Sequence, residues 1–260
     1  MRPVRSELIK LLGSRAVWVV MAFTIVILGV YAYQYTLNPD SGVMVAGLKD
    51  PALLSSMIVL VYAAVYCIPL SVVVGSLVVG REYSAGTMAP LVVIIGRQRL
   101  VWAKAAAVLV IQGMLALAVA IEGIIWGLAV GGTLRHLELH RLLVQIVIGI
   151  GVGFTVSVVA MTVASLSRST ATSVLLCLAV FLGITMFLSD NWLAARILPV
   201  FPWSDPMDYW FSNLSNVRDA SGYSGTPAGL AAGVWIVAYP VFLLVIQAVV
   251  ARYREYGAQS

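Results

Sequence analysis

Few side chains in this sequence are suited to chemistry, because charged residues make up only 10% of the chain. Glu122 is the one formal charge placed deep in a long apolar run. A carboxyl in that position can bind a proton, a cation or a polar group of a transported molecule. It can equally be neutral or hydrogen-bonded where helices pack closely. Both interpretations stay open, and Glu122 is a possible pathway or gate residue.

The segment HLELH has only a partial resemblance to a metal motif. His136 and His140 flank Glu138, whereas HExxH metalloproteases place the acid directly after the first His. The chain also lacks the GxxxxGK[ST] loop that cradles phosphates in P-loop ATPases. We therefore expect no catalytic residues, no metal site and no cofactor in this chain, and no enzyme activity of its own.

A third stretch, GREYSAGTMAPLVVIIGRQRLVWAK at residues 80–104, separates two long apolar runs. It opens with Arg81 and Glu82 and closes with three cations: Arg97, Arg99 and Lys104. A plain linker between two apolar segments needs far fewer polar residues. The stretch is therefore a candidate for binding a partner at a membrane surface.

Part of this stretch has the periodicity of a helix. Met88, Leu91, Val92 and Ile95 recur at i, i+3, i+4 and i+7, which places them on one helix face. Gly86 precedes them and can mark a helix start or a kink. We expect a short helix here, partly sunk into the lipid headgroups, with its polar end exposed.

Composition identifies the elements that must position these residues. Hydrophobic residues make up 61% of the chain, and the charged fraction is far below the roughly 25% of a soluble domain. Spans need about 20 apolar residues each, and uniformly apolar runs predict helices rather than barrel strands. Six such runs form a single six-helix domain over residues 1–260: Ala16–Tyr35, Ala52–Val79, Ala105–Thr133, Leu142–Leu166, Ala171–Ser189 and Ala228–Ala251.

The distribution of Lys and Arg predicts the orientation. With both termini in the cytoplasm, eleven of the 16 basic residues lie inside and five outside, as the positive-inside rule requires. The net charge of +5 follows largely from this bias and does not indicate nucleic-acid binding. We expect a multi-pass protein of the plasma or inner membrane.

The N-terminus predicts one more element. Residues 3–15 contain apolar side chains at helical spacing with charged residues between them, as in a helix lying in the cytoplasmic interface. Gly13 and Ser14 then allow a bend into the first span. On the outer side of the membrane, the loop at 190–227 is rich in aromatic residues and Pro, which is typical of a segment lying on the outer leaflet.

The stretch at 80–104 resembles the signature of type-2 ABC exporter permeases, the membrane subunits of ATP-binding-cassette transporters. Glu82, the Gly86–Thr87 pair, Arg97 and Lys104 match that signature in order and approximate spacing. Many relatives carry a Pro shortly before the Arg, where this chain has Ile94, Ile95 and Gly96. The specific match covers about 25 residues, while the six-span layout agrees along the whole chain.

This resemblance implies a function for the stretch. In that family the segment that corresponds to residues 80–99 forms a coupling helix, which docks on a separate ATP-binding subunit. ATP and Mg would be bound by that subunit. The docking residues would be Arg81, Glu82, Tyr83, Ser84, Ala85, Gly86, Thr87 and Met88. Arg81 and Glu82 would pair with charges on that subunit. A second permease copy, or a similar permease, would complete the pathway within the lipid bilayer.

A different class stays open from the residues alone. An ion-coupled secondary transporter or channel would use Glu122 as its proton or cation site, although it leaves the stretch at 80–104 unexplained. The cargo is equally open between a lipid, a drug and a lipophilic peptide. The sequence also leaves open whether two identical permeases pair and whether the outer loop is a gate.

Overall fold

The computed structural model describes residues 2–37, 51–129, 139–187, 238 and 240–249. Every element in these ranges is a helix. In chain order they are α1 (Arg2–Leu12), α2 (Arg15–Leu37), α3 (Pro51–Ser84), α4 (Met88–Ile95), α5 (Arg97–Ala129), α6 (Leu139–Ser167) and α7 (Thr170–Phe187). A further helical stretch covers Pro240–Val249.

Each of the first five expected apolar segments overlaps one long helix, namely α2, α3, α5, α6 and α7. Within the described residues, Gln98–Trp126 and Gly149–Ser167 are long and apolar enough to cross a membrane. The bent pair Pro3–Leu12 and Arg15–Val30 qualifies as a third if it counts as one span. The chain therefore has the helices of a membrane protein, and the full set of six spans stays a prediction.

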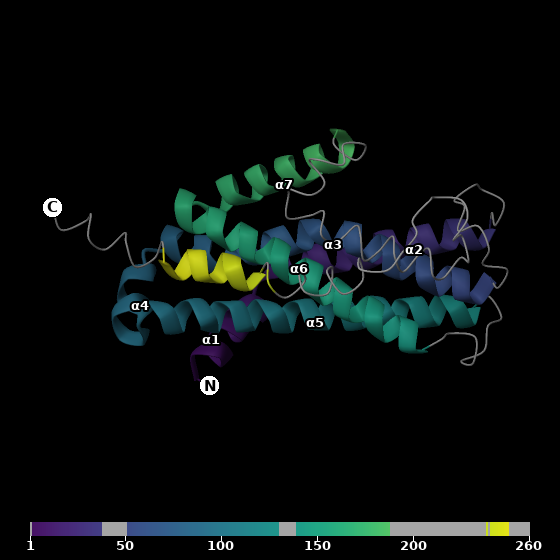
Figure 1. Cartoon of the computed structure of the whole chain (residues 1–260), viewed down its shortest axis with the longest axis horizontal. Helices are drawn as coiled ribbons and strands as arrows, with labels where there is room; N and C mark the ends of the chain where they lie inside the picture. Colours follow the sequence, from purple (N-terminus) through teal and green to yellow (C-terminus); the bar gives the residue numbers. More distant parts are fainter. Residues whose placement is uncertain (1, 38–50, 130–138, 188–237, 239, 250–260) are drawn as a thin grey trace.

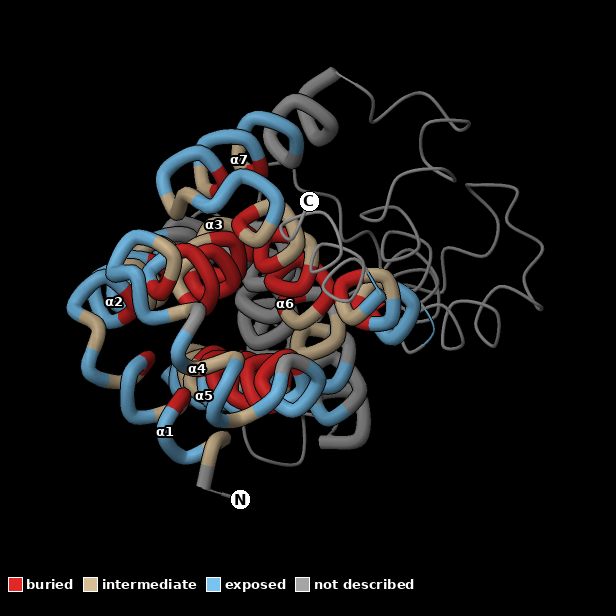
Figure 2. The backbone as a smooth tube through the Cα atoms, turned by 90° about the vertical axis from the view of Figure 1, so that its left-hand side faces the viewer, coloured by how far each residue is buried: buried red, intermediate tan, exposed pale blue. Residues whose placement is uncertain are grey.

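Helix α3 lies at the centre of the bundle and contacts α2, α5, α6 and α7. Seen along the bundle, the buried faces of α3, α5 and α6 meet in the middle (Figure 2). Their core is made of small and branched apolar residues, among them Leu70, Val74 and Val108, which are fully buried. Exposed Leu and Val side chains cover the outward faces, as expected where lipid is the solvent.

Close helix contacts depend on glycine at particular places in α3. A side chain at Gly75 would overlap the backbone of Ser157 in α6, and one at Gly80 would overlap Thr170 in α7. Small residues allow helix backbones to approach in this way. Ser173 of α7 adds two hydrogen bonds at this end, one with Ser76 (2.9 Å) and one to the carbonyl of Ala160 (2.9 Å).

The N-terminus forms a helix that is followed by a bend. Helix α1 ends at Leu12, and the chain turns by 64° into the next helix across Gly13 and Ser14. Figure 1 shows α1 lying across the bundle at the same end as α4, beside α5. Its placement in a membrane interface stays a prediction.

Helices α3 and α5 are longer than a bilayer requires. They contain 34 and 33 residues, which corresponds to about 50 Å each at 1.5 Å per residue. A hydrocarbon core is about 30 Å thick. Both helices therefore extend beyond it, and the junction that joins them through α4 lies at one end of the bundle.

Candidate functional site

The α3–α4 junction is a well-defined turn built on one glycine. Gly86 has a φ of +68°, in the left-handed region that glycine adopts without strain. Its N–H donates to the carbonyl of Tyr83 (3.2 Å), and the N–H of Thr87 donates to the carbonyl of Glu82 (3.0 Å). These two bonds are the Schellman motif, which satisfies the last carbonyls of a helix. Arg81–Ser84 therefore form the last turn of α3.

The apolar face expected of the helix at 88–95 is the more buried side of α4. Met88, Leu91, Val92 and Ile95 are all partly buried, and α4 contacts α5. The opposite face is open, because Val93 and Ile94 are 85% and 80% exposed. Gly96, with a φ of +81°, then ends α4, and its N–H donates to the carbonyl of Val92 (3.0 Å). The glycine provides the sharp turn into α5.

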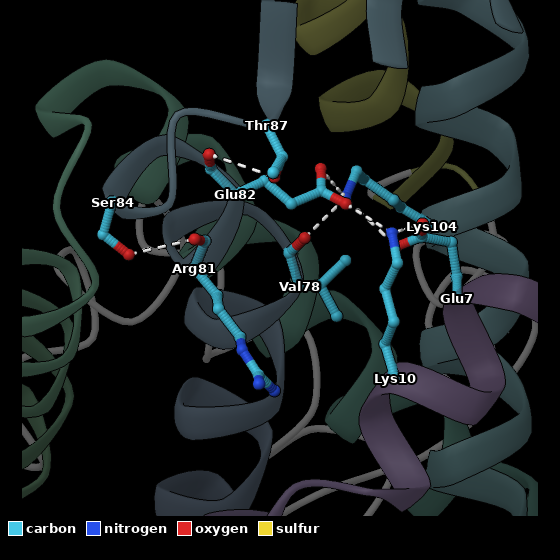
Figure 3. A network of polar contacts seen from close by, with 8 residues as sticks. All are labelled: Glu7, Lys10, Val78, Arg81, Glu82, Ser84, Thr87 and Lys104. Atoms are coloured by element: carbon cyan, nitrogen blue, oxygen red, sulfur yellow. Dashed lines mark hydrogen bonds and ion pairs between the residues drawn. The ribbon is translucent and has the colours of Figure 1, made fainter. Parts of the chain in front are cut away.

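Four charged side chains meet beneath this junction (Figure 3). They come from three helices: Glu7 and Lys10 from α1, Glu82 from α3 and Lys104 from α5. We call these four residues the ion cluster. Glu7, Glu82 and Lys104 are 3%, 6% and 1% exposed, so the cluster lies largely inside the protein.

Each cation of the ion cluster contacts both carboxylates. Lys104 Nζ lies 2.6 Å from Glu82 Oε2 and 3.2 Å from Glu7 Oε2. Lys10 Nζ lies 2.8 Å from Glu82 Oε1 and 2.6 Å from Glu7 Oε1. Lys104 also donates to the carbonyl of Val78 in α3 (2.5 Å). Two acids and two bases give a cluster of zero net charge, which makes the burial of its members tolerable.

Lys10 is the most accessible member of the ion cluster, with a side chain 42% exposed. Partial burial lowers the pKa of Lys10, but the hydrogen bonds and negative charges of Glu7 and Glu82 outweigh this effect. The net result is a pKa raised above the ordinary lysine value. Lys10 therefore remains a cation throughout the physiological range and balances the two acids.

The proposed docking residues divide into an exposed and a buried part. Arg81, Ser84, Ala85, Gly86 and Thr87 are exposed, while Tyr83 and Met88 are partly buried. Glu82 is buried and its carboxylate is engaged by Lys10 and Lys104. The resemblance implies that Glu82 pairs with charges on the ATP-binding subunit. In the structure its carboxylate instead contacts two lysines of the same chain.

The basic residues after α4 also differ from one another. Arg97 begins α5, Arg99 is exposed, and Lys104 is buried in the ion cluster. The sequence places these three cations together at the cytoplasmic end of the stretch at 80–104, and it does not single out Glu7 or Lys10 as site residues. The available signal was a pair of opposite charges three residues apart at the start of a chain with very few charges.

A second polar group lies in the middle of the bundle and was not foreseen. Gln112 of α5 donates through Nε2 to Ser157 Oγ of α6 (2.9 Å), and Ser157 donates to the carbonyl of Ser71 in α3 (2.8 Å). Gln112 is 2% exposed, and a side chain at Gly153 would overlap its amide. These bonds join α3, α5 and α6 at mid-bundle.

Glu122 lies at the other end of α5, far from the α3–α4 junction. It follows Lys104 by 18 residues, which places it about 27 Å along the helix. Its Oε1 lies 3.0 Å from the position that a Cβ of Gly29 in α2 would occupy, and Trp126 is hydrogen-bonded to the carboxyl. The outer loop at 190–227 and the HLE portion of HLELH fall outside the described residues.

The comparison with family models decides the class of the protein. Residues 4–185, more than two thirds of the chain, match the model of the ABC-2 family transporter proteins. The chain belongs to the ABC-2 transporter family. As an ABC-2 family protein it is a membrane-embedded permease of an ABC transporter, in agreement with its apolar helices. A search of curated proteins found no significant match.

Proposed function

We propose that this ABC-2 permease is the membrane subunit of an ATP-driven exporter and that its α3–α4 junction docks on a separate ATP-binding subunit. One observation carries the proposal. The turn Ser84–Thr87 is exposed at the end of the bundle, while the residue beside it, Glu82, is fixed to α1 and α5 through the ion cluster. A surface that receives force from a partner needs this combination of access and rigid support.

The open face of α4 supports the same proposal. Val93 and Ile94 are among the most exposed large apolar side chains of the described residues. The core of a protein–protein interface is more apolar than the rest of the surface, and small residues beside it leave room for a partner to approach closely. Ala85 and Gly86 provide such small residues, and nothing lies within 4 Å of a Cβ built on Gly86. The turn therefore has room for a partner's surface.

The ion cluster gives a route for coupling. Movement of the junction acts on the last turn of α3, and Glu82 transmits it to Lys10 in α1 and Lys104 in α5. In the proposed cycle, ATP binding draws the junctions of two permeases together and changes access to the pathway. A second permease copy, or a similar permease, completes that pathway. Both termini face the cytoplasm, as the basic residues predict.

An ion-coupled secondary transporter that uses Glu122 is the alternative function. It is favoured by one observation, because Glu122 Oε2 is buried and no residue in the described part of the chain hydrogen-bonds to it. The family match weighs against it, since ABC transporters are driven by nucleotide. The two functions differ in their energy source, and this difference can be measured directly.

The test compares two Trp substitutions at exposed positions. Ala85→Trp adds bulk at the proposed docking turn, and Leu117→Trp adds the same side chain on the outward face of α5, where the native side chain is 56% exposed. Each tagged permease is purified from native membranes, and co-purifying proteins are identified by mass spectrometry. We expect an ATP-binding subunit with the wild type and with Leu117→Trp, and its loss with Ala85→Trp.

Two results would contradict the proposal. Retention of the ATP-binding subunit by Ala85→Trp would show that docking occurs elsewhere. Absence of any such subunit from the wild type, with transport persisting after ATP depletion while the ion gradient is held, would favour the secondary transporter.

A further inference from the structure

A carboxyl oxygen without a hydrogen-bond partner marks a second site in the molecule. Glu122 Oε2 is buried, and the described residues supply it with no hydrogen bond. They also supply no cation, because the ion pairs within them all belong to the ion cluster. A buried carboxylate oxygen is costly unless it has a partner. Its surroundings indicate what that partner is.

Aromatic rings line the site. Trp126 follows Glu122 by one helical turn and is hydrogen-bonded to its carboxyl. The ring of Tyr33 in α2 lies 6.3 Å from that of Trp126, with 52° between the two planes. A carboxylate beside Trp and Tyr rings favours ammonium groups, because the charge and the ring faces attract the same ligand. Gly29, opposite Glu122, leaves room for the carboxyl, because its Oε1 lies 3.0 Å from the position that a Cβ would occupy.

The flanks of the site are apolar and open outward. Val26 and Val30 on α2 are 62% and 51% exposed, and Ile121 and Ile125 on α5 are 57% and 59% exposed. Residues three or four apart lie on the same part of a helix surface, so Val26 shares a face with Gly29 and Ile125 shares a face with Glu122, while Val30 and Ile121 lie at the edges of these faces. A ligand that reaches the carboxyl from this side therefore meets hydrocarbon around it.

The position of Glu122 along α5 agrees with a ligand that reaches the carboxyl from the membrane. Glu122 lies about 27 Å along α5 from the ion cluster, which is close to the thickness of a hydrocarbon core. The ion cluster and Glu122 would thus lie near opposite boundaries of the bilayer. Tyr and Trp are enriched at such boundaries, as Tyr33 and Trp126 would be here.

We propose that Glu122, Trp126 and Tyr33, with the carboxyl seated beside Gly29, form a binding site between α2 and α5 for the ammonium group of an amphiphile. The apolar chain of the ligand lies along the exposed Val and Ile side chains. The ammonium group can belong to the headgroup of a surrounding lipid or to a cationic amphiphile that enters from the membrane. This inference concerns binding by the permease alone and does not rest on docking of an ATP-binding subunit.

The first test uses dicyclohexylcarbodiimide, which modifies carboxyl groups accessible from apolar surroundings. The intact permease is placed in nanodiscs of phosphatidylglycerol, and modification of Glu122 is quantified by peptide mass spectrometry. Dodecyltrimethylammonium is added as the probe, and dodecyl maltoside, which is neutral and has the same chain length, as the control. We expect modification of Glu122, its loss with the ammonium probe, and no loss with the maltoside.

A second set of nanodiscs identifies the source of the ligand. Nanodiscs containing phosphatidylcholine present the same trimethylammonium group as a lipid headgroup. Protection of Glu122 in them without added probe assigns the site to a lipid, and protection only by the soluble probe assigns it to a membrane-entering amphiphile. Absence of modification in phosphatidylglycerol nanodiscs, protection by neither probe nor headgroup, or equal protection by probe and maltoside overturns the proposal.

A pair of glycine substitutions tests the geometry without touching the carboxyl. Gly29→Ala places a methyl group 3.0 Å from Glu122 Oε1, whereas Gly113→Ala in α5 has nothing within 4 Å. We expect Gly29→Ala to raise the probe concentration for half protection about tenfold, equivalent to about 1.4 kcal/mol, and Gly113→Ala to leave it unchanged. An unchanged half-protection concentration in a folded Gly29→Ala protein contradicts the proposed site.

Discussion

Lys104 Nζ of α5 lies 2.6 Å from Glu82 Oε2 of α3, and both side chains are buried. This ion pair fixes the last turn of α3, which carries the exposed junction, to the start of the next long helix. Glu7 and Lys10 extend the contact to α1. The junction is therefore supported by three helices rather than by its own chain connections alone.

Removing one member of the ion cluster should be more harmful than neutralising a matched pair. Lys104→Met leaves Glu7 and Glu82 with Lys10 as their one remaining cation in the cluster, and breaking a buried pair costs about 3–5 kcal/mol. Lys104→Met with Glu82→Gln restores neutrality, so we expect part of the stability to return. The unfolding temperatures of the single and the double variant in detergent test this expectation.

Arg99→Met is the control for this comparison, because Arg99 is exposed and lies outside the ion cluster. It should change the unfolding temperature little, as exposed ion pairs contribute about 0–1 kcal/mol. If Lys104→Met were as stable as Arg99→Met, the ion cluster would not hold the three helices together.

The Gln112 group should contribute less than the ion cluster. Gln112→Leu removes the hydrogen bond to Ser157, and such bonds between membrane helices are worth about 0.6 kcal/mol on average and at most about 1.7. We expect a loss near 1 kcal/mol in reversible unfolding. Ser157→Ala removes the same bond and also the one to the carbonyl of Ser71, so the double variant should lose less than the sum of the two single variants. Additive losses would show that the two side chains are not coupled.

Gly75 and Gly113 form a matched pair for testing helix packing. Gly75→Ala adds a methyl group that overlaps the backbone of Ser157, while Gly113→Ala adds it in open space. Alanine favours a helix over glycine by about 1 kcal/mol, so Gly113→Ala should be neutral or stabilising. Gly75→Ala should lower the unfolding temperature, because α3 and α6 must move apart. Equal behaviour of the two variants would contradict the close approach of α3 to α6.

The positive φ of Gly86 predicts which substitutions the junction accepts. Gly86→Asn retains a residue that tolerates the left-handed region, whereas Gly86→Val introduces a branched side chain that does not. We expect Gly86→Asn to keep the unfolding temperature and the co-purifying ATP-binding subunit, and Gly86→Val to lose the subunit. Full retention by Gly86→Val would mean that this turn conformation is not required.

Cysteine labelling tests the orientation. In a chain with Cys67 and Cys177 replaced by Ala, single cysteines at Ser41, Ser212 and Gly222 should react with an impermeant thiol reagent added to intact cells. Cysteines at Ser84 and Gln259 should react only after lysis. The basic residues predict this pattern, and labelling of Ser84 in intact cells would reverse the orientation.

Local sequence patterns predicted the local structure well. The spacing of Met88, Leu91, Val92 and Ile95 predicted the helix α4 and its apolar face, and Gly13 predicted the bend after α1. The role of Glu82 was not predictable in the same way. Its partner Lys10 is 72 residues away in the chain, and whether a charged side chain faces a partner protein or its own core depends on how distant helices pack.

The contacts of Gln112 and Glu122 within the bundle were also not predictable from the sequence. Gln112 meets Ser157 across 45 residues of sequence, and no periodicity within α5 indicates which neighbour it contacts. Gly29 gave no signal either, because its importance lies in the space it leaves beside Glu122. Such contacts follow from tertiary packing, whereas helices and turns follow from short-range spacing and backbone preference.

The long separations within the ion cluster also set an order for biogenesis. Glu7 leaves the ribosome 97 residues before Lys104, and chains are made from the N-terminus onward. Until α3 and α5 have been inserted, Glu7 and Lys10 have only each other and water as partners. Burial of α1 against the bundle must therefore wait for the third long helix, so closure of this cluster divides assembly into a stage before α5 and a stage that adds α6 and α7.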